Sequence, residues 1–64
     1  MELIYKHRWC KIWKLDDCHE LIWKHGGHFD SKAWHIEKCS NGETFEAKWG
    51  FSTKRDALKF WEEL

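Results

Sequence analysis

Asn41 and Gly42 place the strongest local constraint on the fold, because they separate two segments in which apolar and polar residues alternate. Both residues tolerate a positive φ, which suits a two-residue turn between antiparallel strands. Counting outward from the turn gives the expected cross-strand pairs Ser40-Glu43, Lys38-Phe45, Glu37-Glu46, Ile36-Ala47 and Trp34-Trp49. The apolar face of this hairpin is then expected to consist of Trp34, Ile36, Phe45, Ala47 and Trp49.

The segment from Glu2 to Leu15 also alternates, which predicts one long strand. One side of that strand is expected to carry Leu3, Tyr5, His7, Trp9, Lys11, Trp13 and Leu15. Cys10 and Ile12 fall on the other side among basic residues, so that side is not purely polar.

A short helix is expected over residues 18–25. Asp17 followed by Glu20 is typical of a helix start, and Gly26 is typical of a helix end. The apolar stripe of this helix would be Cys18, Leu21, Ile22 and His25. A strand from Leu21 to His25 is the alternative.

A second helix is expected to follow Ser52 or Thr53, either of which can cap it. Its apolar stripe would be Ala57, Phe60, Trp61 and Leu64, with Leu58 beside it. The predicted fold is therefore α+β, with the order β-α-β-β-α, a small antiparallel sheet and helices packed on one face. With 64 residues, the chain is expected to be a single domain over residues 1–64.

The composition limits the cellular compartment and the classes of partner that we expect. Three cysteines cannot all pair within one chain and no secretory signal opens it, so we expect a cytoplasmic protein, with a host-cell cytoplasm included. No apolar run is long enough to span a bilayer, so no membrane role is expected. Equal numbers of cations and anions give no global attraction to nucleic acid. Such a small chain could also be a homodimer that completes its core with a second copy.

Metal and catalytic chemistry are not favoured by the spacing of histidines and cysteines. There is no Cys-x-x-Cys pair, so we expect no cofactor; if zinc supports the fold, the candidate ligands are His25, His28, Cys18 and Cys39. Cys18 and His19 are adjacent, and on a helix their side chains would point about 100° apart. We therefore expect no catalytic dyad and no enzyme.

The last helix carries charges that oppose its dipole, with Lys54 and Arg55 at its start and Glu62 and Glu63 at its end. One interpretation is an anion-binding site formed by Ser52, Thr53, Lys54 and Arg55. The alternative is an ordinary surface pattern.

Six tryptophans are too many for the interior of so small a body. Trp34, Trp49 and Trp61 are predicted core residues, joined by Trp9 or Trp13, whereas Trp23 is the best candidate for exposure. Exposed tryptophan and arginine are enriched in binding hot spots. The predicted contact residues are Trp23, Trp9, Trp13, Lys54 and Arg55.

Residues 34–61 resemble the strand-turn-strand-helix module of AP2-like, arm-type DNA-binding domains of phage integrases. The resemblance is carried by Asn41-Gly42 and by the segment Gly50-Phe51-Ser52-Thr53-Lys54-Arg55-Asp56-Ala57. It implies a sheet that lies on DNA through its outward positions, here His35, Glu37, Thr44, Glu46 and Lys48. More loosely, the short aromatic chain looks like the small accessory and inhibitor proteins of phages and mobile elements.

These patterns together predict a small non-enzymatic binding module. The leading hypothesis is a protein-binding inhibitor or modulator of phage type. A nucleic-acid-binding domain of the integrase arm type is the first alternative, and a zinc-supported interaction domain is the second.

Overall fold

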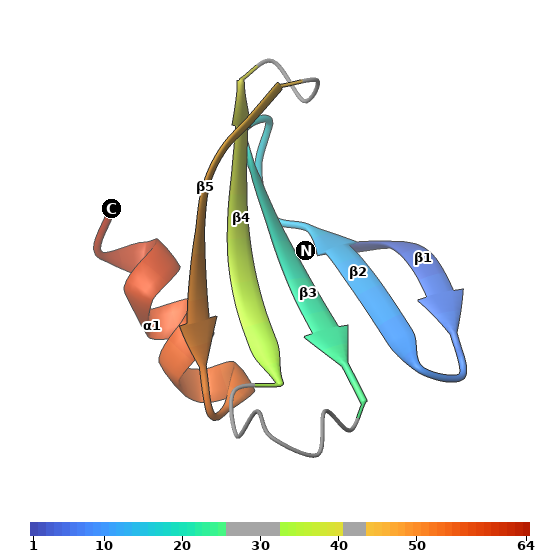
Figure 1. Ribbon diagram of the computed structural model, residues 1–64. Helices are drawn as coiled ribbons and strands as arrows, with labels where there is room; N and C mark the ends of the chain where they lie inside the picture. Colours follow the sequence, from blue (N-terminus) through green and yellow to red (C-terminus); the bar gives the residue numbers. More distant parts are fainter. Residues whose placement is uncertain (26–32, 41–43) are drawn as a thin grey trace.

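The fold is a five-stranded antiparallel sheet followed by one short helix, as the computed structural model shows (Figure 1). The structure describes residues 1–25, 33–40 and 44–64. The strands are β1 (Glu2–His7), β2 (Cys10–Lys14), β3 (His19–Lys24), β4 (Trp34–Ser40) and β5 (Thr44–Phe51), and the helix is α1 (Lys54–Glu62). Neighbouring strands in the chain are neighbours in the sheet, in the order β1-β2-β3-β4-β5. The predicted order β-α-β-β-α, with helices packed on one face, is therefore wrong.

The expected helix over residues 18–25 is strand β3, at the centre of the sheet. Leu21 and Ile22 are both buried although they are adjacent, which suits a strand with apolar contacts on its two faces. The acidic residues before β3 form a turn in place of a helix cap. One Asp16 carboxylate oxygen accepts hydrogen bonds from the backbone N–H groups of Cys18 (2.7 Å) and His19 (2.8 Å). The strand alternative for this segment is the correct one.

The expected long strand from Glu2 to Leu15 is two strands joined by a tight turn at Arg8 and Trp9. The turn has no glycine or asparagine to signal it, and one hydrogen bond from His25 and one within the hairpin hold it. The backbone N–H of His25 donates to the Trp9 carbonyl (2.9 Å), and the Trp9 N–H donates to Nδ1 of His7 (3.2 Å). An irregularity in β1 between Leu3 and Tyr5 also breaks the expected single apolar side.

The hairpin of β4 and β5 is confirmed, but its register differs from the expected one. Ser40 pairs with Thr44 instead of Glu43, and Ile36 pairs with Trp49 instead of Ala47. Glu37 consequently lies opposite Lys48, so the expected pair of two like charges, Glu37 and Glu46, does not form. The cross-strand pairs in this hairpin run from Trp34-Phe51 to Ser40-Thr44. The turn residues 41–43 lie outside the described part of the chain.

Helix α1 begins after Thr53, whose hydroxyl oxygen accepts a hydrogen bond from the backbone N–H of Asp56 (3.1 Å). The helix packs on β4 and β5 and buries Ala57 completely, together with Leu21 and Ile36. The partly buried residues around this centre are Trp13, Leu15, Trp34, Trp49, Phe51, Leu58, Phe60 and Trp61. Leu64, expected in the helix stripe, is exposed. Among the described residues, no helix has the length and apolar character needed to cross a membrane.

Strand β1 forms one edge of the sheet and contacts β2 alone among the strands (Figure 1). Every residue of β1 is exposed, including Leu3, Ile4 and Tyr5. An unpaired edge of this kind offers free backbone groups to another strand. The homodimer that the small size of the chain suggests stays a prediction.

Candidate functional site

One row of side chains crosses all five strands near the end of the sheet at which β1, β3 and β5 finish. Its members, which are cross-strand partners in turn, are Lys6, Lys11, Trp23, Trp34 and Phe51. Cross-strand partners point to the same face of a sheet. Helix α1 packs on β4 and β5, so it does not cover the members of the row on β1, β2 and β3.

Aromatic rings near this row form a continuous series of contacts. The ring centroid of Trp9 lies 5.0 Å from that of His25, which in turn lies 5.9 Å from that of Trp23. Trp23 continues the series to Trp34 at 6.4 Å. Trp34 then stacks on Trp13 at 5.9 Å, with 24° between the two ring planes. The series therefore links the β1-β2 turn to the middle of the sheet.

Three of these rings each carry a cation within cation-π distance. The Arg8 guanidinium lies 5.1 Å from the centroid of Trp9, and the Lys11 ammonium lies 5.6 Å from that of Trp23. Lys54, the first residue of α1, places its ammonium 5.4 Å from the centroid of Trp13. We call the resulting set the Trp-cation surface; it consists of Lys6, Arg8, Trp9, Lys11, Trp13, Trp23, His25, Trp34 and Lys54.

Charges are divided between the two ends of the sheet. The end with the Trp-cation surface, here called the basic end, carries Lys6, Arg8, Lys11, Lys24, Lys54 and Arg55, with Asp56 as an acidic neighbour in the first turn of α1. The opposite, acidic end carries Glu2, Asp16, Asp17, Glu20, Glu62 and Glu63. Its basic neighbours are Lys14 and Lys38, which form ion pairs with Asp17 and Glu46. In the described part of the chain, none of the six cations of the basic end forms an ion pair. The zero net charge therefore conceals a strongly divided surface.

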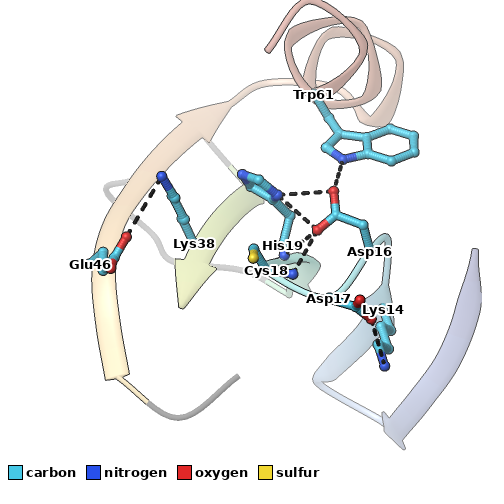
Figure 2. A network of polar contacts seen from close by, with 8 residues as sticks. All are labelled: Lys14, Asp16, Asp17, Cys18, His19, Lys38, Glu46 and Trp61. Atoms are coloured by element: carbon cyan, nitrogen blue, oxygen red, sulfur yellow. Dashed lines mark hydrogen bonds and ion pairs between the residues drawn. The ribbon is translucent and has the colours of Figure 1, made fainter. Parts of the chain in front are cut away.

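The acidic end is held together by Asp16, which lies between the β2-β3 turn and the end of α1 (Figure 2). Its carboxylate accepts a hydrogen bond from the indole N–H of Trp61 (2.8 Å) and contacts Nδ1 of His19 (2.9 Å). Partial burial raises the pKa of Asp16, but the hydrogen bonds from Trp61, Cys18 and His19 outweigh that effect and lower the pKa to about 2. Asp16 is therefore a structural anion that joins the helix to the sheet.

The structure brings four of the five predicted contact residues together. Trp9, Trp13, Trp23 and Lys54 all belong to the Trp-cation surface, whereas Arg55 is exposed on α1 without a ring contact. Trp9 is the exposed tryptophan, with 51 % of its surface accessible, and Trp23 is only partly exposed.

Sequence reasoning missed Lys11 and His25 as members of this surface, and it missed the contact between Arg8 and Trp9. Lys11 pairs with Trp23 across β2 and β3, a neighbour relation that depends on recognising β3 as a strand. Arg8 reaches Trp9 through a turn that no sequence signal marks. A strand assignment for Leu21 to His25 would have revealed the first of these contacts.

The four residues proposed for anion binding do not form a separate site. Thr53 uses its hydroxyl oxygen to cap α1, and the Lys54 ammonium is directed to the ring of Trp13. Ser52 and Arg55 are exposed, and Lys54 contributes to the Trp-cation surface instead.

The residues proposed for zinc binding are not assembled either. Cys18 and Cys39 are neighbours, since the backbone N–H of Cys39 donates to the Cys18 carbonyl (2.8 Å). His25 lies beyond the other end of β3, about 20 Å away at ~3.3 Å per residue, and His28 lies outside the described residues. Among the residues that the structure describes, no group of three or more potential ligands is placed to hold a metal ion.

Cys39 lies beside a hollow of about 470 Å³ at the acidic end, lined also by Lys14, Asp17 and Glu20. Burial raises the pKa of the Cys39 thiol, and the carboxylates of Glu37, Glu20 and Glu46 raise it further. Because the thiolate is the reactive form, we expect iodoacetamide at pH 8 to modify Cys39 at least about fivefold more slowly in the folded chain than in urea. Peptide mass spectrometry measures both rates, and equal rates would contradict this prediction.

The chain is thus a small antiparallel sheet protein with one covering helix and a divided charge distribution. Comparisons with protein-family models, with curated proteins and with solved structures find no match for it. The resemblance of residues 34–61 to integrase arm domains stays a prediction. The Trp-cation surface is the candidate functional site.

Proposed function

We propose that this chain is a non-enzymatic module that binds nucleic acid through the Trp-cation surface. The observation that carries the proposal is the gathering of four cations, Lys6, Arg8, Lys11 and Lys54, beside exposed and partly exposed tryptophan rings. None of the four forms an ion pair among the described residues. A surface of this kind attracts phosphates and offers flat apolar area to bases.

The division of charge between the two ends of the sheet favours nucleic acid over protein as the partner. Composition alone favours a protein partner, because equal numbers of cations and anions predict no overall attraction to nucleic acid. Attraction depends on the local field, however, and the screening length is only about 10 Å at 0.1 M salt. Glu62 and Glu63 lie at the far end of α1 from Lys54, so they reduce the field at the basic end only weakly. A protein partner with an acidic surface becomes an outcome to be tested.

The proposed face differs from the one that the integrase resemblance implies. That resemblance puts DNA on Glu37, Lys48 and their neighbours, on the sheet face opposite α1. Glu37 lies there between Glu20 on β3 and Lys48 on β5, so two carboxylates are side by side at the centre of the face. Phosphates would be repelled at that point, whereas the Trp-cation surface has no carboxylate in its row.

We expect a variant with Lys11→Ala and Lys54→Ala to bind a labelled oligonucleotide about 10- to 30-fold more weakly than the parent at 0.1 M salt, since two phosphate contacts are removed. The matched control removes the same charge elsewhere, with Lys48→Ala and Lys59→Ala, and should change affinity by less than about twofold. Fluorescence anisotropy measures both, with circular dichroism to confirm that each variant is folded.

Salt dependence provides the second readout of the same experiment. If four cations of the surface each neutralise one phosphate, raising the salt from 50 to 200 mM should weaken binding of the parent by about 50-fold. Equal losses in the two double variants, or a flat salt response, would contradict the proposed function.

A further inference from the structure

We infer that the nucleic acid bound by the Trp-cation surface is single-stranded, an inference that rests on the proposed function. The accessible groups of this surface include tryptophan rings. Half of the Trp9 surface is accessible, at 51 %, and Trp23 is partly accessible. Ring faces gain contact area by stacking on bases, but in a duplex the base faces already stack on each other. Only an unpaired strand offers free base faces to these rings.

Rings and cations occur in pairs on the Trp-cation surface. Each of three rings has one cation within 5.6 Å of its centroid. The pairs are Trp9 with Arg8, Trp23 with Lys11, and Trp13 with Lys54. A single strand has the complementary repeat, with one flat base for each phosphate. A base stacked on a ring places its own phosphate within reach of the neighbouring cation. The surface therefore matches two or three consecutive nucleotides.

Helix α1 is not placed to read a duplex. A helix that reads a duplex must protrude far enough to enter the major groove. Here α1 is packed along β4 and β5, and its buried face carries Ala57 at the centre of the core. Apart from Lys54 at the start of α1, the members of the Trp-cation surface lie on strands or directly beside them, which suits a nucleic-acid strand lying across the sheet.

The same composition predicts weak sequence preference. Lysine and arginine can contact guanine, but they also bind any phosphate. The other side chains that distinguish bases at their edges are chiefly asparagine and glutamine, which donate and accept, and carboxylates, which accept. Among the described residues, the Trp-cation surface contains none of these. Stacking and phosphate contacts are available to every base.

The test measures binding of a labelled 12-nucleotide thymidine strand, a 12-nucleotide mixed strand and a 12-base-pair duplex by anisotropy. We expect both single strands to bind at least about tenfold more tightly than the duplex, and within about threefold of each other. Trp9→Ala and Trp23→Ala should each weaken single-strand binding about 5- to 100-fold. Neither substitution should change duplex binding by more than about twofold, because phosphate contacts alone would hold a duplex.

Trp9 is exposed, so Trp9→Ala keeps the test valid if Trp23→Ala fails to fold. Quenching of tryptophan emission by the thymidine strand, reduced in Trp9→Ala, would support stacking directly. Equal or tighter duplex binding would overturn the inference while leaving the proposed function in place. Failure of all three probes to bind would overturn the proposed function itself, and a partner captured without nucleic acid would then indicate a protein.

Discussion

Ile36→Ala is expected to leave a large fraction of the chain unfolded at 25 °C. Ile36 is completely buried at the centre of the sheet, between Leu21 on β3 and Trp49 on β5, and it packs with Ala57 of α1. Shortening a buried isoleucine to alanine costs about 2–5 kcal/mol, because the cavity is filled only in part. A core of this size supplies only about 3–5 kcal/mol of net stability, so one substitution removes most of it.

Urea unfolding followed by circular dichroism measures this loss. The control is Leu64→Ala, which shortens an apolar residue that is 61 % exposed and should change the free energy of unfolding by less than about 0.5 kcal/mol. A loss below about 1 kcal/mol for Ile36→Ala would mean that the core does not centre on this residue.

Asp16→Ala is expected to lower the free energy of unfolding by about 2 kcal/mol, since hydrogen bonds to a charged group are each worth about 1.5–3 kcal/mol and solvent reduces the total. The Asp16 carboxylate binds the β2-β3 turn and the indole of Trp61, so its loss frees both the turn and the end of α1 (Figure 2). For a chain of this size we expect a fall in Tm of about 10 °C.

Asp17→Ala is the matched control for Asp16→Ala. Asp17 has the same charge and is the next residue, but its side chain is 99 % exposed and its contact with Lys14 is long, at 3.8 Å. We therefore expect a change of less than about 0.5 kcal/mol. Trp61→Phe separates the parts of the Asp16 effect, because it keeps an aromatic ring and removes the indole donor. Equal effects of Asp16→Ala and Asp17→Ala would contradict the structural role of Asp16.

The Asp16 carboxylate also makes the free energy of unfolding depend on pH in the acid range. The pKa of Asp16 is lowered from 3.8 to about 2 in the folded chain, so the unfolded chain takes up the proton first as the pH falls. The contribution is complete above about pH 4 and is lost as the pH approaches 2. Because the side chain is 41 % exposed, we expect the parent to lose only about 1 kcal/mol more than Asp16→Asn over this interval. Parallel unfolding curves at pH 5 and pH 2 measure the difference.

The error at residues 18–25 shows how a local signal can be read correctly and assigned to the wrong structure. Asp16, just ahead of the expected cap at Asp17, does accept hydrogen bonds from backbone N–H groups two and three residues later, as a capping side chain does. The same bonds form a turn between two strands. The neighbouring strands decide between a helix cap and a turn. Leu21 and Ile22 are both buried in a strand that has β2 on one side and β4 on the other.

The candidate site shows a similar limit. The sequence shows more tryptophans than a small core can hold, and it shows Lys54 at a helix start, where its charge opposes the helix dipole. Four of the five contact residues predicted from these features lie together in the structure. Their partners were not visible, because Lys11 meets Trp23 through a strand pairing and Arg8 meets Trp9 through an unsignalled turn. The candidate anion-binding and zinc-binding residues were chosen because they lie close together in the sequence. In the folded sheet they do not form a site.

The sequence by itself determined the elements whose signals are local. The apolar alternation on both sides of residues 41–42 specified a hairpin, and the polar cap at Thr53 with the spacing of Ala57, Phe60 and Trp61 specified α1. The tertiary structure decided the identity of β3, the turn at Arg8 and Trp9, and the register of the hairpin. These features depend on hydrogen bonds and burial between segments far apart in the chain, and such contacts outweigh local propensity when the local energies are small.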